Sequence, residues 1–490
     1  MDIKNTFKEP EFNKISDLVW EIPKTFKKKM NVPVRVYATE SLLKKMDLQV
    51  FEQITNVATL PGIEKYAFAL PDSHAGYGFC IGGVAAFDIN AGGVISPGGI
   101  GFDQNCGMRL VATNLDIKDV RPKIKEITDL LFKEVPAGVG SMSKLKISRD
   151  EFRELAETGA EWAVKKGYGW EEDLGHTELE GVAGWADSSK ISEKAVSRGI
   201  KQMGTLGSGN HYLEVQYIKE EDIKDRYIAK KWGLFPGQVV IMFHTGSRGA
   251  GHQIASDYLQ LFLEVMERKY GIKVVDRELA CAPFQSKEGQ DYYMAMGCGV
   301  NISFVNRQII LNKIRGVFST VLEKDPDKLG MTQIFDIAHN RASLEKHRVD
   351  GEEKELLVHR KGSTGSYPPG KKETPAVFRK DGSPVIVGGS METGSYLLVG
   401  GRKADETFDS TVHGSGRTMS RAKARGMTEG RELFRKMLKN GIYVRSASWS
   451  GLAEESGSSY KDIDEVVDIV DSAGISKKVC RFTPVSNVKG

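Results

Sequence analysis

Residues 96–115, SPGGIGFDQNCGMRLVATNL, combine a glycine-rich turn with the apolar strand that directly follows it. The same combination recurs in GQVVIMFH at 237–244, a strand that ends in a glycine-rich turn, and in PVIVGGSMETGSYLLVGG at 384–401, two strands around a glycine loop. Short apolar runs between glycine clusters are typical of strands joined by tight turns. Because glycine lets backbone come close to a neighbouring group, we expect these turns to approach something closely.

Segments with helical spacing separate these strands, and Ser148 with Glu151 forms a capping-box pattern at the start of one of them. Further strands are expected in TQIFDIAHN (332–340) and ELLVHRKGST (355–364), with a short helix between them. Helices are expected over 121–134, 148–166, 253–270, 300–323, 417–439 and 460–471. Strands and helices therefore interleave without a regular βαβ rhythm, which predicts a mixed α/β (α+β) fold. A Rossmann fold is disfavoured, because no GxGxxG motif opens a helix directly after a first strand.

No internal repeat and no linker rich in proline and serine divides the chain, so we expect one large domain over residues 1–490. Residues 1–70 are the least diagnostic part of it. Residues 167–200 are polar, contain two tryptophans, and are expected to run over the surface.

The 490 residues include 69 basic and 65 acidic side chains, a net charge of +4. This balance does not indicate a nucleic-acid binder, so any polyanion site must be a local patch. No apolar run of about 18 residues predicts a membrane span, and the N-terminal MDIKNTFKEPEFNKI lacks the apolar part of a secretory signal. Five scattered cysteines without a CxxC pair fit a reducing compartment. We therefore expect a cytoplasmic protein with no membrane partner.

Four of the nine histidines have settings that favour a functional site. His244 and His339 close apolar, strand-like runs, while His211 and His413 lie beside glycines and other small residues. For any single one of them, a core or loop histidine bonded to a backbone carbonyl is the commoner interpretation. Four in similar settings favour imidazoles that a ligand can approach.

Asp103 and Cys106 add a carboxylate and a thiol three residues apart in DQNC. Taken alone, Cys106 is more simply explained as a free buried cysteine. Together with imidazoles, however, these groups select a divalent transition metal rather than Mg²⁺ or Ca²⁺. A thiolate can bridge two ions, which would accommodate five candidate ligands: Asp103, Cys106, His211, His244 and His339. A zincin or a zinc ribbon is not expected, because HExxH and paired CxxC motifs are missing.

Phosphate chemistry is indicated by two arginines, Arg248 and Arg417, each four residues after a histidine with only small residues between. Arginine provides a bidentate fork for phosphate, and GGSMETGS at 388–395 offers backbone N–H groups for an anion. His413 need not bind metal, because neutral imidazole is a competent nucleophile toward phosphorus. The basic residues from Arg417 to Arg425 could hold an RNA or DNA backbone; a solvated helix face explains them equally well.

Separate motifs follow one another along the chain: PDSHAGYGF, SPGGIGFDQNC, GTLGSGNHYLEV, HTGSRGAGH, DIAHNRA, VHRKGST, GSM, HGSGRTMSRAKAR, YKDIDEVVD and the terminal Lys489-Gly490. From about Pro71 to Gly490 they closely resemble the RtcB-type RNA-splicing ligases. This resemblance implies a mixed α/β fold particular to that family, with two bound Mn²⁺ ions. One ion would lie with Asp103, Cys106 and His211, and the other with Cys106, His244 and His339.

The resemblance also implies a reaction. His413 would attack the α-phosphate of GTP, release pyrophosphate and become guanylylated. An RNA 2′,3′-cyclic phosphate would be opened to a 3′-phosphate, which would accept GMP, and a 5′-hydroxyl end would then displace GMP to join the strands. The RNA would be broken tRNA or exon halves, in tRNA splicing or RNA repair, with an archease-type activator as a further partner.

The same resemblance assigns the site residues. His413, Arg248 and Arg417 would be catalytic. The nucleotide would contact Asn210, His211, Tyr212, Leu213, Glu214, His339, Asn340, Gly388, Gly389, Ser390, Met391, Ser395, His413, Gly414, Ser415, Gly416, Tyr460 and Lys489.

Two other functions stay open from the sequence. A two-metal phosphoesterase or nuclease would use the same ions to activate water, without a covalent nucleotide. A non-enzymatic RNA-binding protein would hold a structural metal, although structural sites are usually closed by four ligands. The order of metal affinities does not favour Mn²⁺ over Zn²⁺ or Co²⁺.

Overall fold

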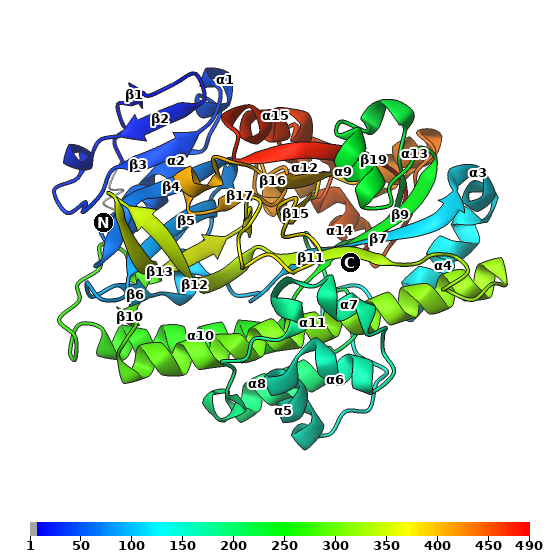
Figure 1. Cartoon of the computed structure of the whole chain (residues 1–490), viewed down its shortest axis with the longest axis horizontal. Coiled ribbons are helices and arrows are strands. Elements are labelled where there is room, and N and C mark those ends of the chain that lie inside the picture. Colours follow the sequence, from blue (N-terminus) through cyan, green and yellow to red (C-terminus); the bar gives the residue numbers. More distant parts are fainter. Residues whose placement is uncertain (1–6) are drawn as a thin grey trace.

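The computed structural model describes residues 7–490, whose framework is two large β-sheets with long helices along one side (Figure 1). The first sheet has seven strands, mostly from the N-terminal part of the chain. Their order is β1 (Asn13–Lys14), β2 (Val19–Ile22), β3 (Val34–Tyr37), β4 (Ile63–His74), β5 (Ile81–Asp88), β13 (Glu352–Lys361) and β12 (Asn340–Val349). Apolar side chains of this sheet form one core with α2 (Leu48–Val57) and α15 (Ile463–Ala473).

The second sheet has eight strands, drawn from positions far apart in the sequence. Along it lie β11 (Gln333–Ala338), β7 (Gly107–Asp116), β9 (Gln238–Thr245), β8 (Tyr212–Tyr217), β19 (Ser476–Lys489), β16 (Ser395–Gly400) and β15 (Pro384–Val387); β18 (Tyr443–Ser446) pairs with β19 in parallel. Two short pairs complete the β-structure: β6 (Val94–Ile95) with β10 (Ala282–Pro283), and β14 (Ser363–Gly365) with β17 (Ser410–Val412).

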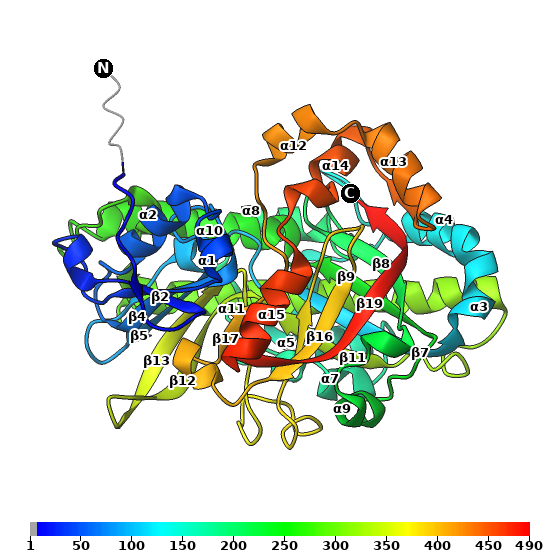
Figure 2. The same cartoon turned by 90° about the horizontal axis from the view of Figure 1, so that it is seen from above.

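Two long helices, α10 (Arg248–Val265) and α11 (Lys287–Leu322), run beneath the sheets, and smaller helices lie on their outer side (Figure 1). These smaller helices are α5 (Arg149–Thr158), α6 (Ala160–Lys165) and α8 (Glu193–Ile200). Beside the sheets, α12 (Arg421–Met427), α13 (Gly430–Lys439) and α14 (Trp449–Glu454) form a lobe (Figure 2). Among residues 7–490, no helix has the length and apolar character needed to span a membrane.

A buried charge cluster joins α11 to the strands that lead to the functional site. Asp336 on β11 accepts hydrogen bonds from Arg109 on β7 (2.6 Å) and from two nitrogens of Arg307 on α11 (both 2.8 Å). All three side chains are inaccessible to solvent. Burial alone would raise the pKa of Asp336, but the two guanidinium groups hold it below its usual value. Because a buried carboxylate is tolerated only with such partners, this cluster fixes the relative positions of the three elements.

The expected mixed α/β class is confirmed, and the architecture is not a Rossmann fold. The capping box of Ser148 and Glu151 is present at the start of α5, although Gly159 divides the expected helix over 148–166 into α5 and α6. The expected helix over 417–439 is likewise divided, into α12 and α13.

The prediction of a short helix between residues 340 and 355 is wrong. This segment forms strand β12, which pairs with β13 along its whole length. Its Ala, Leu, Glu and Lys residues favour a helix in isolation. Tertiary contacts decide otherwise, since Glu345 on β12 pairs with Arg360 on β13 through Oε2 and Nη2 at 2.9 Å, with both side chains buried. The paired geometry overrides the local preference.

Residues 167–200 form short helices and loops, and they also contribute buried charges. Asp173 forms two 2.7 Å hydrogen bonds with Arg315 of α11, and Glu178 pairs with Arg341 at 2.6 Å. The segment is therefore tied to the long helix and to β12.

Candidate active site and metal centre

Four neighbouring strands of the second sheet bring the candidate metal ligands together, because two of them begin and two of them end at the same place in the sheet. Cys106 immediately precedes β7, His211 immediately precedes β8, His339 immediately follows β11, and His244 lies at the end of β9. The register pairs the first residue of β8 with His244, and the first residue of β7 with the last residue of β11. Residues separated by more than 200 positions therefore meet because the strands are antiparallel and in this register.

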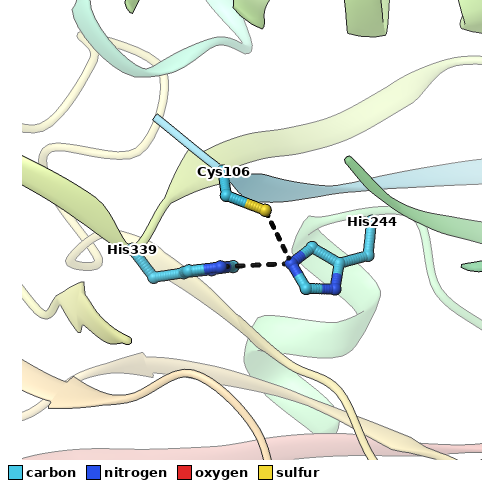
Figure 3. Close-up of side chains that lie close together, drawn as sticks. All are labelled: Cys106, His244 and His339. Carbon is cyan, nitrogen blue, oxygen red and sulfur yellow. Dashed lines mark hydrogen bonds between the residues drawn. The ribbon is translucent and has the colours of Figure 1, made fainter. Parts of the chain in front are cut away.

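The ligand atoms form two groups that share the thiol of Cys106. The first group contains Cys106, His244 and His339: Sγ lies 3.1 Å from Nε2 of His244, which lies 3.1 Å from Nε2 of His339 (Figure 3). The second contains Asp103, Cys106 and His211, where Nε2 of His211 lies 3.3 Å from Sγ and 3.0 Å from Asp103 Oδ2. Within each group the ligand atoms lie within 4.8 Å of one another.

Backbone carbonyls orient two of the imidazoles. Nδ1 of His211 lies 2.9 Å from the Leu206 carbonyl oxygen, and Nδ1 of His244 lies 3.0 Å from that of Asn210. A carbonyl can only accept, so Nδ1 carries the proton and Nε2 directs its lone pair into the site. This is the arrangement in which histidine binds a metal ion.

The protonation of these groups follows from their burial. Burial lowers the pKa of His244 and of His339 well below the usual value, so both are neutral ligands. Burial and the nearby Asp103 raise the pKa of the Cys106 thiol well above its usual value. Burial would also raise the pKa of Asp103, but His211 and Arg248 hold it below its usual value. The site thus holds a carboxylate, neutral imidazoles and a thiol that needs a cation beside it to lose its proton.

His413 follows β17 and enters the same cavity from the other side. Its Nδ1 lies 2.7 Å from Oδ2 of Asp72, and the same oxygen accepts the backbone N–H of His413 at 3.0 Å. Asp72 is completely buried, and the centroid of the His413 ring lies 4.7 Å from that of His339. Asp72 therefore fixes the imidazole with Nδ1 as the donor, so Nε2 is the nitrogen that carries the lone pair in the neutral ring.

The cavity has a volume of about 380 Å³. The expected metal ligands line it, as do Arg417 and most of the residues expected at the nucleotide. These are Asn210, His211, Tyr212, Glu214, His339, Asn340, Gly388, Gly389, Ser390, Met391, His413, Gly414, Ser415, Gly416, Tyr460 and Lys489.

Three expected residues lie behind the cavity wall. Leu213 is 1% exposed and packs in the core on the opposite face of β8. Ser395 is buried and accepts a hydrogen bond from Gln216 at 3.1 Å. Arg248 has a left-handed backbone conformation (φ 56°) at the start of α10, where its N–H donates to Asp103 at 3.1 Å. Its guanidinium lies against His211, with Nη1 3.4 Å from Nδ1.

Charged groups flank the glycine loops at the far end of the cavity. Arg417 Nη1 lies 3.1 Å from Oε1 of Glu455 and 3.2 Å from the hydroxyl of Tyr460, and Lys489 Nζ lies 3.3 Å from Glu455 Oε2. Burial would raise the pKa of Glu455, but Lys489, Tyr460 and Arg417 lower it to about 2. Burial raises the pKa of Glu214 to about 7, against the opposing effect of Lys489. The Glu455 carboxyl is thus an anion at neutral pH, whereas the Glu214 carboxyl exchanges protons near neutral pH.

Several residues that line the cavity, or that contact its lining, were not identified from the sequence. Asp72 and Lys361 occupy the motifs PDSHAGYGF and VHRKGST, yet neither stood out by residue type or spacing. Lys361 donates to the backbone carbonyls of Tyr77 and Phe79, and burial lowers its pKa to about 8. Asp72 lies two residues before His74, and Lys361 directly follows His359 and Arg360, so neither motif offered a signal that singled out its residue. Also missed on the cavity wall were His74, Tyr77, Phe102, His252 and Glu455, whereas Arg421, expected only as a contact of a nucleic-acid backbone, lines the cavity as well.

The comparisons with known proteins agree with one another. The family model described as "tRNA-splicing ligase RtcB" matches residues 53–490. A protein of that name from Archaeoglobus fulgidus is 50% identical over 478 residues, which cover 97% of this chain and 98% of the relative. The protein of the same name from Thermococcus kodakarensis is 49% identical over 479 residues, which cover 97% of this chain and 98% of the relative. That from Nanoarchaeum equitans is 46% identical over 493 residues, which cover 100% of both chains.

Proposed function

Because the chain belongs to the tRNA-splicing ligase RtcB family, we propose that it joins RNA 2′,3′-cyclic phosphate or 3′-phosphate ends to 5′-hydroxyl ends, with GTP as co-substrate. The observation that carries this proposal is the oriented imidazole of His413 in the cavity that holds both candidate metal groups. Broken tRNA or exon halves would be the RNA. An archease-type activator stays a prediction from the resemblance, and a cytoplasmic location stays a prediction from the cysteines and the N-terminal sequence.

The donor atoms fit two divalent transition-metal ions that share Cys106, and we propose Mn²⁺. Asp103, Cys106 and His211 would hold one ion, and Cys106, His244 and His339 the other. Such ions would neutralise phosphate oxygens and polarise the phosphorus for attack. The lone pairs of His211 and His244 already point into the site, so these ligands need no change of tautomer.

In the first step, His413 Nε2 would attack the α-phosphorus of GTP. A phosphorus–nitrogen bond would form as the bond from the α-phosphorus to its bridging oxygen breaks, and pyrophosphate would leave. The imidazole would gain positive charge, which the Asp72 carboxylate at Nδ1 stabilises. Arg417 would stabilise the negative charge on the phosphates.

In the later steps, water would open the 2′,3′-cyclic phosphate to a 3′-phosphate. An oxygen of that phosphate would attack the phosphorus of the guanylylated His413, and the phosphorus–nitrogen bond would break to regenerate the imidazole. The 5′-hydroxyl of the second RNA would then lose its proton, attack the activated 3′-phosphate and displace GMP.

The nucleotide would lie between the glycine loops 388–391 and 414–416, whose small residues let the backbone approach phosphate and base. Glu214 could accept from the guanine N–H groups when ionised, and the ring of Tyr460 could contact the base. Lys489, Asn210 and Asn340 supply further polar groups on this wall. Contacts of the nucleotide with Leu213 and Ser395 stay predictions, because both side chains lie behind the wall.

The test is to incubate the purified protein with Mn²⁺ and GTP, measure the intact mass and map any adduct by peptide analysis. We expect a mass gain of one GMP, located on His413. If the protein binds metal but gains no mass, even with an archease-type activator, the covalent step is wrong. A two-metal phosphoesterase that activates water would then be the better interpretation.

Replacing Asp72 by asparagine is expected to slow nucleotide attachment by about 10²- to 10⁴-fold, without loss of metal. An asparagine side chain can offer its N–H₂ group to Nδ1, which would favour the tautomer with the proton on Nε2 and remove the nucleophile. The measurement is the single-turnover rate of adduct formation. A rate close to that of the wild-type protein would show that Asp72 does not control the tautomer.

A further inference from the structure

Residues 417–449, here called the basic lobe, comprise α12, α13, β18 and the first residue of α14. They contain nine basic residues and two acidic residues, a net charge of +7. Because the whole chain has a net charge of +4, the remaining residues together carry −3. The positive charge of this protein is therefore concentrated in one lobe, which stands beside the sheets (Figure 2).

The basic lobe is continuous with the active-site cavity. Arg417 and Arg421 line that cavity. Arg425 lies one turn farther along α12, a rise of about 6 Å, and lines a second hollow of about 550 Å³ with Arg431 and Trp449. A row of arginines thus leads out of the cavity to an exposed tryptophan.

The backbone on both sides of Trp449 is held in place. Gly430 lies against its carbonyl, where an added Cβ would come within 2.1 Å of the oxygen. Ala447, two residues before Trp449, donates its N–H to the carbonyl of Lys489 at 3.1 Å. The lysine side chain lines the active-site cavity, so the lobe and the cavity share this fixed segment.

The indole of Trp449 is nevertheless 48% exposed. The ring of Phe434 meets it edge to face at 5.8 Å, and the Arg431 guanidinium lies 5.9 Å from its centroid. A large apolar ring that is half exposed, close to a cation and carried on a held backbone suits the stacking of a nucleobase.

Some of the lobe's cations are already paired, and others are free to meet phosphate. Arg425 contacts Glu454 at 2.8 Å, and Arg421 lies 3.5 Å from Glu455. Within the described part of the chain, no carboxylate lies within 4.0 Å of four exposed cations: Lys423, Arg431, Arg435 and Lys439. These four can neutralise an RNA backbone without first breaking an ion pair.

We propose that the basic lobe binds the RNA strand that ends in the 3′-phosphate, with Trp449 stacking one of its bases outside the active-site cavity. The inference rests on the proposed function, because that strand must bring its phosphate to His413. The lobe begins four residues after His413 and leads away from it, whereas Arg248 lies beside Asp103 and His211. The 3′-phosphate strand is therefore the one that the lobe is placed to hold.

The experiment compares the wild-type protein with Trp449→Ala, Trp449→Phe and Tyr227→Ala. Tyr227 is a matched control, since it is 71% exposed on α9 (Arg226–Lys231), away from the lobe (Figure 2). The probe is a single-stranded RNA with a 3′-phosphate, used intact and with one abasic nucleotide at successive positions. The measurement is the Kd for each pair of protein and RNA.

We expect Trp449→Ala to weaken binding of the intact RNA by roughly fivefold to a hundredfold. Trp449→Phe should retain much of the affinity, and Tyr227→Ala should match the wild-type protein. At one RNA position, removal of the base should weaken binding to the wild-type protein but cause no further loss with Trp449→Ala, as expected for direct partners.

Lys423→Gln should reduce the slope of log Kd against log salt by about 0.7.

Several results would overturn the proposal. Trp449→Ala could bind the 3′-phosphate strand as well as the wild-type protein does, or lose affinity only for a 5′-hydroxyl strand. It could also lose only its response to a protein activator, which would make the lobe a protein-binding surface. Nucleotide attachment without RNA should be equal in all four proteins. If the wild-type protein forms no adduct, the proposed function fails, whereas the RNA-binding comparison still reports on Trp449.

Discussion

Replacing His413 by alanine is expected to abolish nucleotide attachment and to reduce RNA joining by at least about 10³-fold, because the proposed nucleophile is removed. Metal content should stay near the wild-type value, since His413 belongs to neither group of metal-ligand atoms. The measurements are intact mass after incubation with Mn²⁺ and GTP, and metal content of the same sample by elemental analysis.

His413→Gln is a suitable companion, because it keeps a polar side chain in the cavity but has no imidazole. Both variants should give the same result. Loss of one metal ion in either variant would identify His413 as a ligand instead. Adduct formation in either variant would place the covalent bond on another residue.

Replacing Cys106 by serine is expected to remove both metal ions and, with them, nucleotide attachment. Its Sγ is the only ligand atom common to the two groups found among the described residues. A serine hydroxyl does not provide the thiolate that transition metals prefer at this position. The loss of metal affinity should exceed the roughly 10- to 100-fold cost of removing a residue that only supports a ligand. Metal content per protein, titrated against added Mn²⁺, measures the effect.

Cys298→Ser on α11 provides a control, because Cys298 is also buried but packs in an apolar cluster apart from the metal ligands. This variant should keep both ions, and thermal unfolding measures its stability separately. Loss of only one ion in Cys106→Ser would disprove the bridging role. An unfolded Cys106→Ser protein would be recognised from its circular dichroism and replaced by Cys106→Ala.

The sequence indicates which residues are candidate metal ligands, but it says much less about which of them lie together in space. The settings of Asp103, Cys106, His211, His244 and His339 in the sequence predict metal ligands, and the structure brings these five residues together in two groups. Their division into two groups around Cys106 came only from the resemblance. Physically, it depends on the register of β7, β8, β9 and β11, which is set by contacts over more than 200 residues.

Other features were missed because their causes are tertiary. Asp72 lies 341 positions before His413, and no local pattern relates a strand carboxylate to a histidine so distant. The strand β12 was mistaken for a helix because the buried Glu345–Arg360 pair is invisible to local propensity. Leu213 and Ser395 do not line the cavity, and their contacts with the nucleotide stay predictions.

The central position of β19 has a consequence for biosynthesis. This strand pairs with β8 on one side and β16 on the other, yet it follows both in the sequence, β8 by more than 250 residues. While the polypeptide emerges from the ribosome, β8 and β16 lack this neighbour, and their unpaired backbone edges are open to association with other nascent chains. The sheet that supports the candidate site therefore closes only after β19 has been synthesised, and the interval before closure is when aggregation competes most strongly with folding.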